Sequence, residues 1–555
     1  MAGLNHHRVA APGFFRFAVL VLGIAGVYSL LIFHLFHLQI EQGTLYAIQA
    51  DKQHLLAGEL EPARGRIYFT DKNGNSVQAA ISRSYPIVYA VPKKIEDAAK
   101  TAASLAPILD VEIKELEKQL GKKDDPYELL ASRLSEDKIE AVDALNIKGI
   151  DTDRKDFRFY PLHELAAHIL GYVGPVESGG EFIGRYGVEF YKESELKGRP
   201  GKVGGGKLVK PESGQDLALT IDRDIQAQAE KILKDLVATS KAQGGSVIVE
   251  EPATGKILAL GNYPAFDPNR YWEFEVGRFL NPVSQAIYEP GSVFKVITIA
   301  AALDSGRIIP QTEFFDGGSL TIDGKTIKNW DLLSHGRITP VNILEKSINV
   351  GAALVEKELG HENFYQYLVK FGFDEVTGVE LPEELAGNLK NLKAGRGRSI
   401  NFATAAFGQG IAVTPLELIS AVAAIANQGV LLRPQLIDQN QPEIVRQVIS
   451  AEAAGAVTEM MVSALRKAEI GHIPRYRLAG KTGTAQVADL INGGYTGEVI
   501  NTYVGFGPVK KPRFIILIKL DKPAGAPLAG QTVVPAFREL AQFILNYYNI
   551  PPDDL

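Results

Sequence analysis

The stretch Tyr288-Glu289-Pro290-Gly291-Ser292-Val293-Phe294-Lys295, followed by the apolar residues 296–303, is the segment around which the rest of the chain is organised. Pro290-Gly291 is a turn signal, and the residues after it predict a buried helix over 293–303 with Ser292 at its N-terminus. Unpaired backbone N–H groups and the helix dipole favour negative charge at that end. Lys295 lies about one turn further along the same face, and a lysine in an apolar helix loses its charge more easily than in water. The stretch therefore predicts a serine nucleophile with a lysine as its base.

The pattern S-x-x-K is a weak signal when it stands alone, because the chain contains it three times. Ser135/Lys138 and Ser194/Lys197 lie in charged surroundings, which predict solvated helix faces. Ser292/Lys295 alone combines a preceding turn with a following apolar helix. The other two pairs are therefore set aside.

A second motif, Ser347-Ile348-Asn349, follows in the chain. The Ser347 hydroxyl can relay a proton towards a leaving amine, and the Asn349 amide can bond both a peptide substrate and Lys295. Ser399-Ile400-Asn401 repeats the pattern. Ser347 is preferred because a helix-like run, 350–359, follows it directly, whereas Ser399 leads into a segment that reads as a loop.

A third motif, Lys481-Thr482-Gly483-Thr484, comes last and occurs once. Lys481 supplies a cation for a substrate carboxylate, and Gly483 lets a substrate backbone lie close to the strand. The backbone N–H groups of Ser292 and Thr484 could form an oxyanion hole for a tetrahedral intermediate. Three ordered motifs together predict acyl transfer far more strongly than any one of them.

Composition sets broad limits on the protein class. The chain has 555 residues, 46% hydrophobic and 22% charged, with a net charge of −6 and no cysteine. The size predicts several domains, and the charge gives no reason to expect nucleic acid as a partner. The missing cysteines exclude structural disulfides and thiolate chemistry. No metal site is predicted, since the two histidines of His163-Glu164-Leu165-Ala166-Ala167-His168 are one residue too far apart for a zinc-protease helix.

The N-terminal segment has the pattern of a membrane anchor. Residues 17–36 contain no Asp, Glu, Lys or Arg, and about 20 apolar residues suffice for a helix to cross a bilayer. Arg8 and Arg16 precede the stretch and Glu41 follows it, so the N-terminus is expected in the cytoplasm and the remainder outside it. A cleaved signal peptide is the competing interpretation, but no small-x-small cleavage site follows closely.

The pattern of short strands and helices predicts an α+β protein. We expect a cytoplasmic tail at 1–16, an anchor at 17–38, an elongated α+β module at 39–214 and a catalytic domain at 215–555. In the last of these, strands come first and last with helices between. That order predicts one antiparallel sheet closed by its two ends, with a helical subdomain inserted.

These motifs resemble those of class B penicillin-binding proteins, the monofunctional peptidoglycan D,D-transpeptidases. The resemblance covers nearly the whole chain, with Lys72 and Ile348 as small departures that remove no catalytic group. The module 39–214 then corresponds to the family's pedestal, or dimerisation-like, domain. The supporting patterns are Arg64-Gly65-Arg66-Ile67, Asp71-Lys72-Asn73-Gly74, Arg158-Phe159-Tyr160-Pro161, His168-Ile169-Leu170-Gly171-Tyr172, Gly187-Val188-Glu189, Gly408-Gln409-Gly410 and Thr414-Pro415.

The resemblance implies what the site acts on. Ser292 would attack the penultimate D-Ala carbonyl of a peptidoglycan stem peptide, on nascent or lipid-linked precursor, and the acyl group would pass to an amine of a neighbouring stem. Lys481, with Thr482 and Thr484, would hold the donor's carboxylate, and β-lactams would acylate Ser292. No cofactor is implied. The chain has no glycosyltransferase domain, so a multi-spanning glycan polymerase of the shape, elongation, division and sporulation group is the expected partner, alongside other division proteins.

Several alternatives remain at this point. The segment Val88-Tyr89-Ala90-Val91-Pro92 and the compact pedestal favour the septal branch of the family over the elongation branch. A β-lactamase or carboxypeptidase is less favoured, although Glu384-Leu385-Ala386-Gly387-Asn388 has the pattern of a deacylation glutamate. A non-catalytic division scaffold would not need the full motif set. A β-lactam sensor would need a cytoplasmic output domain larger than residues 1–16.

Overall fold

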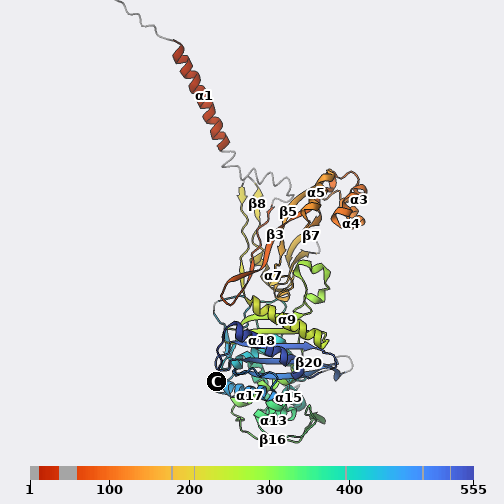
Figure 1. Cartoon of the computed structure of the whole chain (residues 1–555), viewed down its shortest axis with the longest axis vertical. Coiled ribbons are helices and arrows are strands. Elements are labelled where there is room, and N and C mark those ends of the chain that lie inside the picture. The colour runs from red at the N-terminus through yellow and green to blue at the C-terminus, as the bar shows by residue number, and fades with distance from the viewer. Residues whose placement is uncertain are drawn as a thin grey trace, which may run out of the picture. The chain divides into compact units, whose positions relative to one another are not determined.

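The computed structural model describes residues 12–36, 59–176, 179–204, 207–393, 397–439, 441–489, 493–525 and 527–554. They fold into two compact units (Figure 1). The smaller unit contains Ser84–Asp156, Gly198–Ser213 and the described residues before Arg64. The larger contains Arg64–Arg83, Phe157–Lys197 and the described residues from Gly214 onward, so it takes up two segments of the predicted module 39–214. Both units mix helices and strands, which confirms the predicted α+β class.

Helix α1 (Pro12–Phe36) contains residues 17–36 of the predicted anchor. The last two anchor residues, 37–38, and the tail before residue 12 lie outside the described residues. Among the helices that the structure describes, none combines the length and apolar character needed to cross a membrane.

The smaller unit has a small core of its own between helices and strands. Helix α3 begins after Asp97, whose side chain accepts a hydrogen bond from Lys100 N at 3.0 Å and so caps the helix. Leu105, Leu116 and Leu130 come from three different elements and meet in this core. The elements are β1 (Glu59–Leu60), the last residues of β3 (Ser76–Ala90), α3 (Ala98–Leu109), α4 (Ile113–Leu120), β4 (Glu128–Ser132), α5 (Glu136–Leu145), β5 (Ile150–Phe159), β8 (Gly201–Gly204) and β9 (Lys207–Val209).

The first segments of the larger unit are held together by a buried ion cluster. The Glu189 side chain is fully buried and accepts hydrogen bonds from Arg158 Nε at 2.5 Å and from Arg64 Nε at 2.9 Å. Arg158 Nη1 also donates to Gly65 O at 2.8 Å. The cluster thereby joins three stretches that are far apart in sequence. Around it lie β2 (Ile67–Thr70), the start of β3, α6 (Ala167–Leu170), β6 (Val173–Val176), β7 (Gly179–Gly184), α7 (Gly187–Tyr191) and α8 (Glu193–Leu196).

A five-stranded antiparallel sheet in the order β12-β11-β21-β20-β19 forms the centre of the larger unit. Its strands come from both ends of the catalytic region, since β11 pairs with β21 along its length. This is the closure that the sequence predicted. The strands are β11 (Gly244–Glu251), β12 (Lys256–Tyr263), β19 (Ala479–Ala488), β20 (Tyr495–Gly507) and β21 (Phe514–Asp521).

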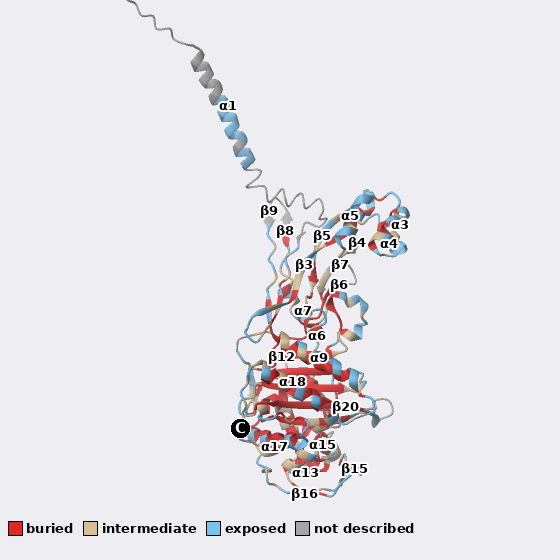
Figure 2. Cartoon of the chain, in the orientation of Figure 1, coloured by how far each residue is buried: buried red, intermediate tan, exposed pale blue. Residues whose placement is uncertain are grey.

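Alternate residues of these strands bury the two faces of the sheet against different helices. Val249 and Ile516 share a core with α9 (Arg223–Ser240) and α18 (Val533–Tyr547). Ile248 and Leu517 belong to the second core, which includes residues of the inserted helices. In Figure 2 much of these strands is coloured as buried (red). The catalytic sheet is therefore a rigid support.

The inserted subdomain is mostly helical, as predicted, with short hairpins at its periphery. It contains the helix that follows Ser292 and the turn that carries Ser347. Its elements are η3 (Pro268–Glu273), η4 (Val276–Phe279), α10 (Pro282–Gln285), η5 (Gly291–Phe294), α11 (Lys295–Asp304), β13 (Phe314–Asp316), β14 (Ser319–Ile322), β15 (Lys325–Lys328), β16 (Gly336–Ile338), α12 (Pro340–Lys346), α13 (Asn349–Leu359), α14 (His361–Lys370), α15 (Ser399–Ala405), α16 (Pro415–Ala426), β17 (Val430–Leu432), β18 (Ile444–Gln447) and α17 (Ala451–Ala468). The parallel strand β10 (Leu217–Asp222) pairs with β2.

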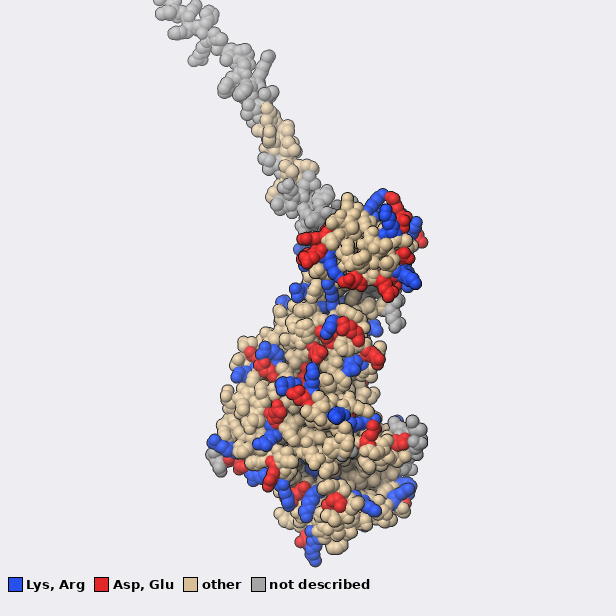
Figure 3. Space-filling view, turned by 45° about the vertical axis from the view of Figure 1, so that its right-hand side comes forward, with Lys and Arg blue, Asp and Glu red and all other residues tan. Residues whose placement is uncertain are grey.

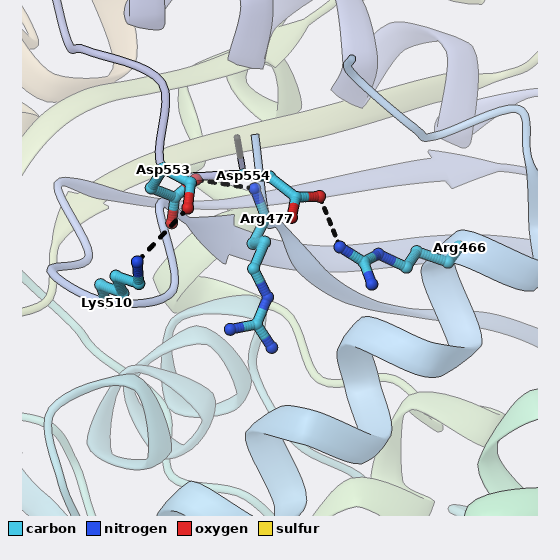
Figure 4. A pocket seen from close by; sticks show the side chains of 5 residues that line it. All are labelled: Arg466, Arg477, Lys510, Asp553 and Asp554. Atoms are coloured by element: carbon cyan, nitrogen blue, oxygen red, sulfur yellow. Dashed lines mark hydrogen bonds and ion pairs between the residues drawn. The ribbon is translucent and has the colours of Figure 1, made fainter. Parts of the chain in front are cut away.

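Charge is mixed on the face shown in Figure 3, where acidic and basic side chains alternate among uncharged ones. The C-terminal residues close a polar pocket beside the start of β19 (Figure 4). Asp553 Oδ1 accepts a hydrogen bond from Arg477 N at 2.8 Å, and Asp554 pairs with Arg466 at 2.5 Å. The chain end therefore fixes the segment that leads into the strand carrying Lys481.

Candidate active site

Ser292 lies in a short 3₁₀ turn, η5, and the α-helix begins at Lys295 rather than directly after the serine. Gly291 adopts a φ of +60°, which favours glycine. A Cβ at Gly291 would lie 3.1 Å from Ala485 Cβ and 3.2 Å from Thr484 O. The segment around Ser292 therefore packs directly on strand β19.

Lys295 is fully buried and its amine is the centre of the site. Lys295 Nζ lies 2.9 Å from Ser292 Oγ, and it donates to Ser347 O at 2.6 Å and to Asn349 Oδ1 at 2.8 Å. Burial, and after it the charge of Lys481, hold the pKa of Lys295 well below its usual range. The structure thus brings the first two sequence motifs together around one nitrogen atom.

Ser347 lies between two lysine amines. Its Oγ is 3.2 Å from Lys295 Nζ and 3.1 Å from Lys481 Nζ. The residue ends α12 in the left-handed conformation, with a φ of +57°. That conformation directs the Ser347 carbonyl to Lys295 and places Asn349 at the start of α13, where Asn349 Nδ2 donates to Lys328 O at 3.0 Å.

Strand β19 is an edge strand and carries the third motif. Lys481 Nζ donates to Thr482 O at 2.9 Å, and burial lowers the pKa of Lys481 to about 7. A cavity of about 70 Å³ borders Lys481 and Thr482. Thr484 Oγ1 accepts a hydrogen bond from Ala529 N at 3.2 Å. Of the predicted carboxylate-binding residues, Lys481 and Thr482 therefore line this cavity, and Thr484 lies further along the same strand.

Gly483 has a neighbour that the sequence did not predict. A Cβ at this position would come within 2.9 Å of Pro290 O and of Val293 Cγ2. The glycine thus allows the segment around Ser292 to approach the strand, in addition to any role towards substrate.

The sequence predicts no role for Glu289, but in the structure its side chain forms hydrogen bonds with two distant segments. Its carboxylate accepts hydrogen bonds from Gly410 N at 3.0 Å and from Tyr495 OH at 3.0 Å. Burial raises the pKa of Glu289. An acidic residue inside an otherwise apolar and turn-forming stretch was the available signal for this contact.

The alternative serine, Ser399, and the alternative glutamate, Glu384, have hydrogen-bond partners outside the three motifs. Ser399 Oγ is 3.2 Å from His361 Nε2, and the residue begins the short helix α15, which ends at Ala405 before the predicted loop at 407–411. Glu384 Oε1 accepts from Thr377 N at 2.8 Å and Glu384 Oε2 from Gly378 N at 2.9 Å, so this carboxylate holds its own loop.

Comparisons with known proteins agree with this geometry. Residues 245–542 match the family described as penicillin binding protein transpeptidase domain, and residues 59–206 match the penicillin-binding protein dimerisation domain. The chain is 30% identical to Stage V sporulation protein D of Bacillus subtilis, covering 85% of this chain and 76% of that protein. It is 28% identical to the peptidoglycan D,D-transpeptidase FtsI homolog of Mesostigma viride, covering 97% of both.

A solved structure agrees in fold. Penicillin Binding Protein 2X from Streptococcus thermophilus matches with a TM-score of 0.70 over 88% of this chain and 81% of that one, at 24% identity. From the two family matches and the relatives together, the chain belongs to the class B penicillin-binding proteins and is a peptidoglycan D,D-transpeptidase.

Proposed function

We propose that Ser292 is the nucleophile of this transpeptidase and Lys295 its general base. The observation that carries the proposal is the position of Lys295 Nζ, fully buried and 2.9 Å from Ser292 Oγ. A neutral amine has two N–H groups and one lone pair. Ser347 O and Asn349 Oδ1 take the two N–H groups, which leaves the lone pair to accept the Ser292 proton.

The reaction then proceeds by two acyl transfers. Ser292 Oγ attacks the penultimate D-Ala carbonyl of a stem peptide, while the backbone N–H groups of Ser292 and Thr484 stabilise the oxyanion. The proton passes from Lys295 through Ser347 Oγ to the departing nitrogen, and the terminal D-Ala leaves. An amine of a neighbouring stem attacks the ester, returns its proton along the same path and releases Ser292.

Lys481 has the position to hold the donor's carboxylate, with Thr482 and Thr484 beside it. Its amine contacts Ser347 Oγ, Thr482 O and Thr482 Oγ1, and Lys481 and Thr482 both line the cavity that borders the strand. Gly483 completes this binding strand. The same groups would receive the carboxylate of a β-lactam, which acylates Ser292.

We expect the binding of a D-Ala-D-Ala peptide to weaken as pH rises above about 7. The pKa of Lys481 is about 7 in the free protein, and a bound carboxylate favours the charged amine, so binding takes up a proton above that pH. Affinity should fall by up to about tenfold per pH unit. Calorimetric titration of the Ser292→Ala variant from pH 6 to 9 measures this, and a peptide ending in a carboxamide is the control. The same slope with the carboxamide would contradict the role of Lys481.

The hydrogen bonds that the Glu384 carboxylate accepts favour transpeptidation over hydrolysis. A deacylating glutamate must present its carboxylate to a water molecule beside the acyl-enzyme. Both Glu384 oxygens instead accept backbone N–H groups of Thr377 and Gly378. A non-catalytic scaffold is disfavoured because all the catalytic groups of the three motifs are present and in contact.

The cellular setting extends this proposal. We place residues 1–16 in the cytoplasm, the single-pass anchor at 17–38, the pedestal at 39–214 and the transpeptidase domain at 215–555, outside the cytoplasmic membrane. The charge-free stretch 17–36, with Arg8 and Arg16 before it, supports this topology. Septal cell-wall synthesis, with a multi-spanning glycan polymerase and other division proteins as partners, is our choice over elongation, on the strength of the compact pedestal.

The test labels the full-length protein in detergent with a fluorescent penicillin. We expect a stable adduct on Ser292 that is absent from Ser292→Ala. Ser135→Ala, which alters another S-x-x-K pair in the smaller unit, is the matched control and should label normally. An adduct that clears within seconds would indicate a β-lactamase, and an adduct that persists in Ser292→Ala would refute the assigned nucleophile.

A further inference from the structure

The segment between strands β15 and β16 presents large apolar side chains to solvent near the active site. Trp330 is 58% exposed, Leu332 72% and Leu333 59%. In Figure 2 this part of the chain, beside the labels β15 and β16, contains exposed residues (pale blue). Exposed apolar groups gathered in one place mark a site of interaction more often than scattered ones do.

The segment is held firmly by buried polar groups beneath it. Asn329 is 1% exposed, and its Nδ2 donates to Asp316 Oδ2 at 2.8 Å and to Leu333 O at 2.9 Å. Asn329 Oδ1 accepts from Val350 N at 3.1 Å, and the fully buried Asp316 also accepts from His335 N at 3.1 Å. The exposed side chains therefore project from a fixed backbone.

Trp330 is tied to the second catalytic motif. Its indole Nε1–H donates to Lys346 O at 3.0 Å, and Lys346 directly precedes Ser347. Two residues before Trp330, Lys328 O accepts from Asn349 Nδ2. The single polar atom of the indole is thus satisfied by the protein, and the exposed ring face is left to form apolar contacts.

We propose that Trp330 is a stacking platform for an N-acetylated saccharide of a peptidoglycan strand. The C–H groups on one face of a pyranose pack against an aromatic ring, and Leu332 and Leu333 offer apolar surface for acetyl methyl groups. This inference rests on the proposed function, because it concerns the glycan to which the stem peptide is attached.

A short chain of contacts joins Ser292 to Trp330. Ser292 Oγ, Lys295 Nζ and Ser347 O are linked by contacts of 2.9 and 2.6 Å, and Lys346 O contacts the indole. An extended stem whose fourth residue reacts reaches about 13 Å, at roughly 3.3 Å per residue. In the proposed complex, a stem held at Ser292 places its saccharide on Trp330. A rigid ring at that position costs little conformational entropy on binding.

Direct binding can be measured because the chain has only two tryptophans. In full-length Ser292→Ala/Trp272→Phe, Trp330 is the single indole, and we expect its emission to change saturably with the disaccharide N-acetylglucosaminyl-N-acetylmuramic acid. Ser292→Ala/Trp330→Phe keeps the similarly exposed Trp272 and should show no change. No response, or an equal response in both proteins, would overturn the proposal.

Kinetics supply a second test. Trp330→Ala should raise KM about tenfold for substrates that carry the disaccharide and leave KM unchanged for the same peptides without it. Trp272→Ala, the matched control, should change neither. Placing the disaccharide on the donor alone or on the acceptor alone identifies which strand meets the indole.

Acylation by benzylpenicillin separates this proposal from the proposed function. Trp330→Ala should be acylated at the wild-type rate, since penicillin has no saccharide. If acylation falls together with cross-linking, Trp330 merely supports residues 346–349 and the saccharide proposal fails. If wild-type Ser292 is not labelled at all, the proposed function fails, and the fluorescence titration still decides the saccharide site. Binding of a protein that Trp330→Ala abolishes, with saccharide binding unchanged, would also overturn the platform.

Discussion

Replacing Lys295 by arginine should slow the acylation of Ser292 by penicillin at least about 1,000-fold, while the protein remains folded. Burial and the charge of Lys481 lower the pKa of the wild-type amine, which favours its neutral form. A guanidinium stays protonated at any accessible pH and has no lone pair to accept the Ser292 proton. Stopped-flow measurement of fluorescent penicillin labelling gives the rate.

The pH profile makes this prediction specific. In the wild-type protein the rate should rise with pH as Lys295 loses its proton, and then level off; in Lys295→Arg the low rate should stay flat. Lys138→Arg changes the lysine of another S-x-x-K pair and should label normally. A Lys295→Arg protein that labels at the wild-type rate would remove Lys295 as the base.

The substitution Glu189→Gln should lower the free energy of unfolding by about 3–5 kcal/mol. It removes the charge that faces Arg158, which is 5% exposed, and reduces the ion pairs of Arg64 to the one with Glu193. Burial opposes ionisation of Glu189, but the charges of Arg158 and Arg64 outweigh it, and the pKa of Glu189 is lowered. The contribution of this carboxylate is therefore present above pH 4.5 and is lost as pH falls through the lowered pKa.

Urea denaturation of the full-length protein, followed by circular dichroism, measures the loss. Glu195→Gln is the matched control, since Glu195 pairs with Lys192 at the surface with 39% of its side chain exposed. It should change the free energy of unfolding by less than about 1 kcal/mol. Equal effects of the two substitutions at pH 7 would show that the buried cluster does not stabilise the larger unit.

Much of the site could be predicted because its signals are local. The turn at Pro290-Gly291 and the apolar helix after it identify Ser292 and Lys295, and strands at both ends of the catalytic region predict the sheet that the structure has. The features that the sequence did not predict depend on backbone conformation or on contacts between residues far apart in the chain.

A helix that follows the serine does not distinguish Ser347 from Ser399, since a helix begins at Ser399 as well. What distinguishes them is the left-handed backbone of Ser347, which turns its carbonyl towards Lys295. A serine carries no sequence signal for that conformation. The bond between Glu289 and Tyr495 was equally hidden, because the partners are 206 positions apart.

The position of β19 at the edge of its sheet has a further consequence for recognition. An edge strand leaves a row of backbone N–H and C=O groups without a partner strand, and an extended peptide can pair with them as an added strand. Such β-augmentation reads the main chain of the ligand rather than its side chains. If a stem peptide pairs with β19 in this way, stems that differ in their middle residues should bind alike, and a peptide mimic needs an extended backbone before it needs any particular side chain.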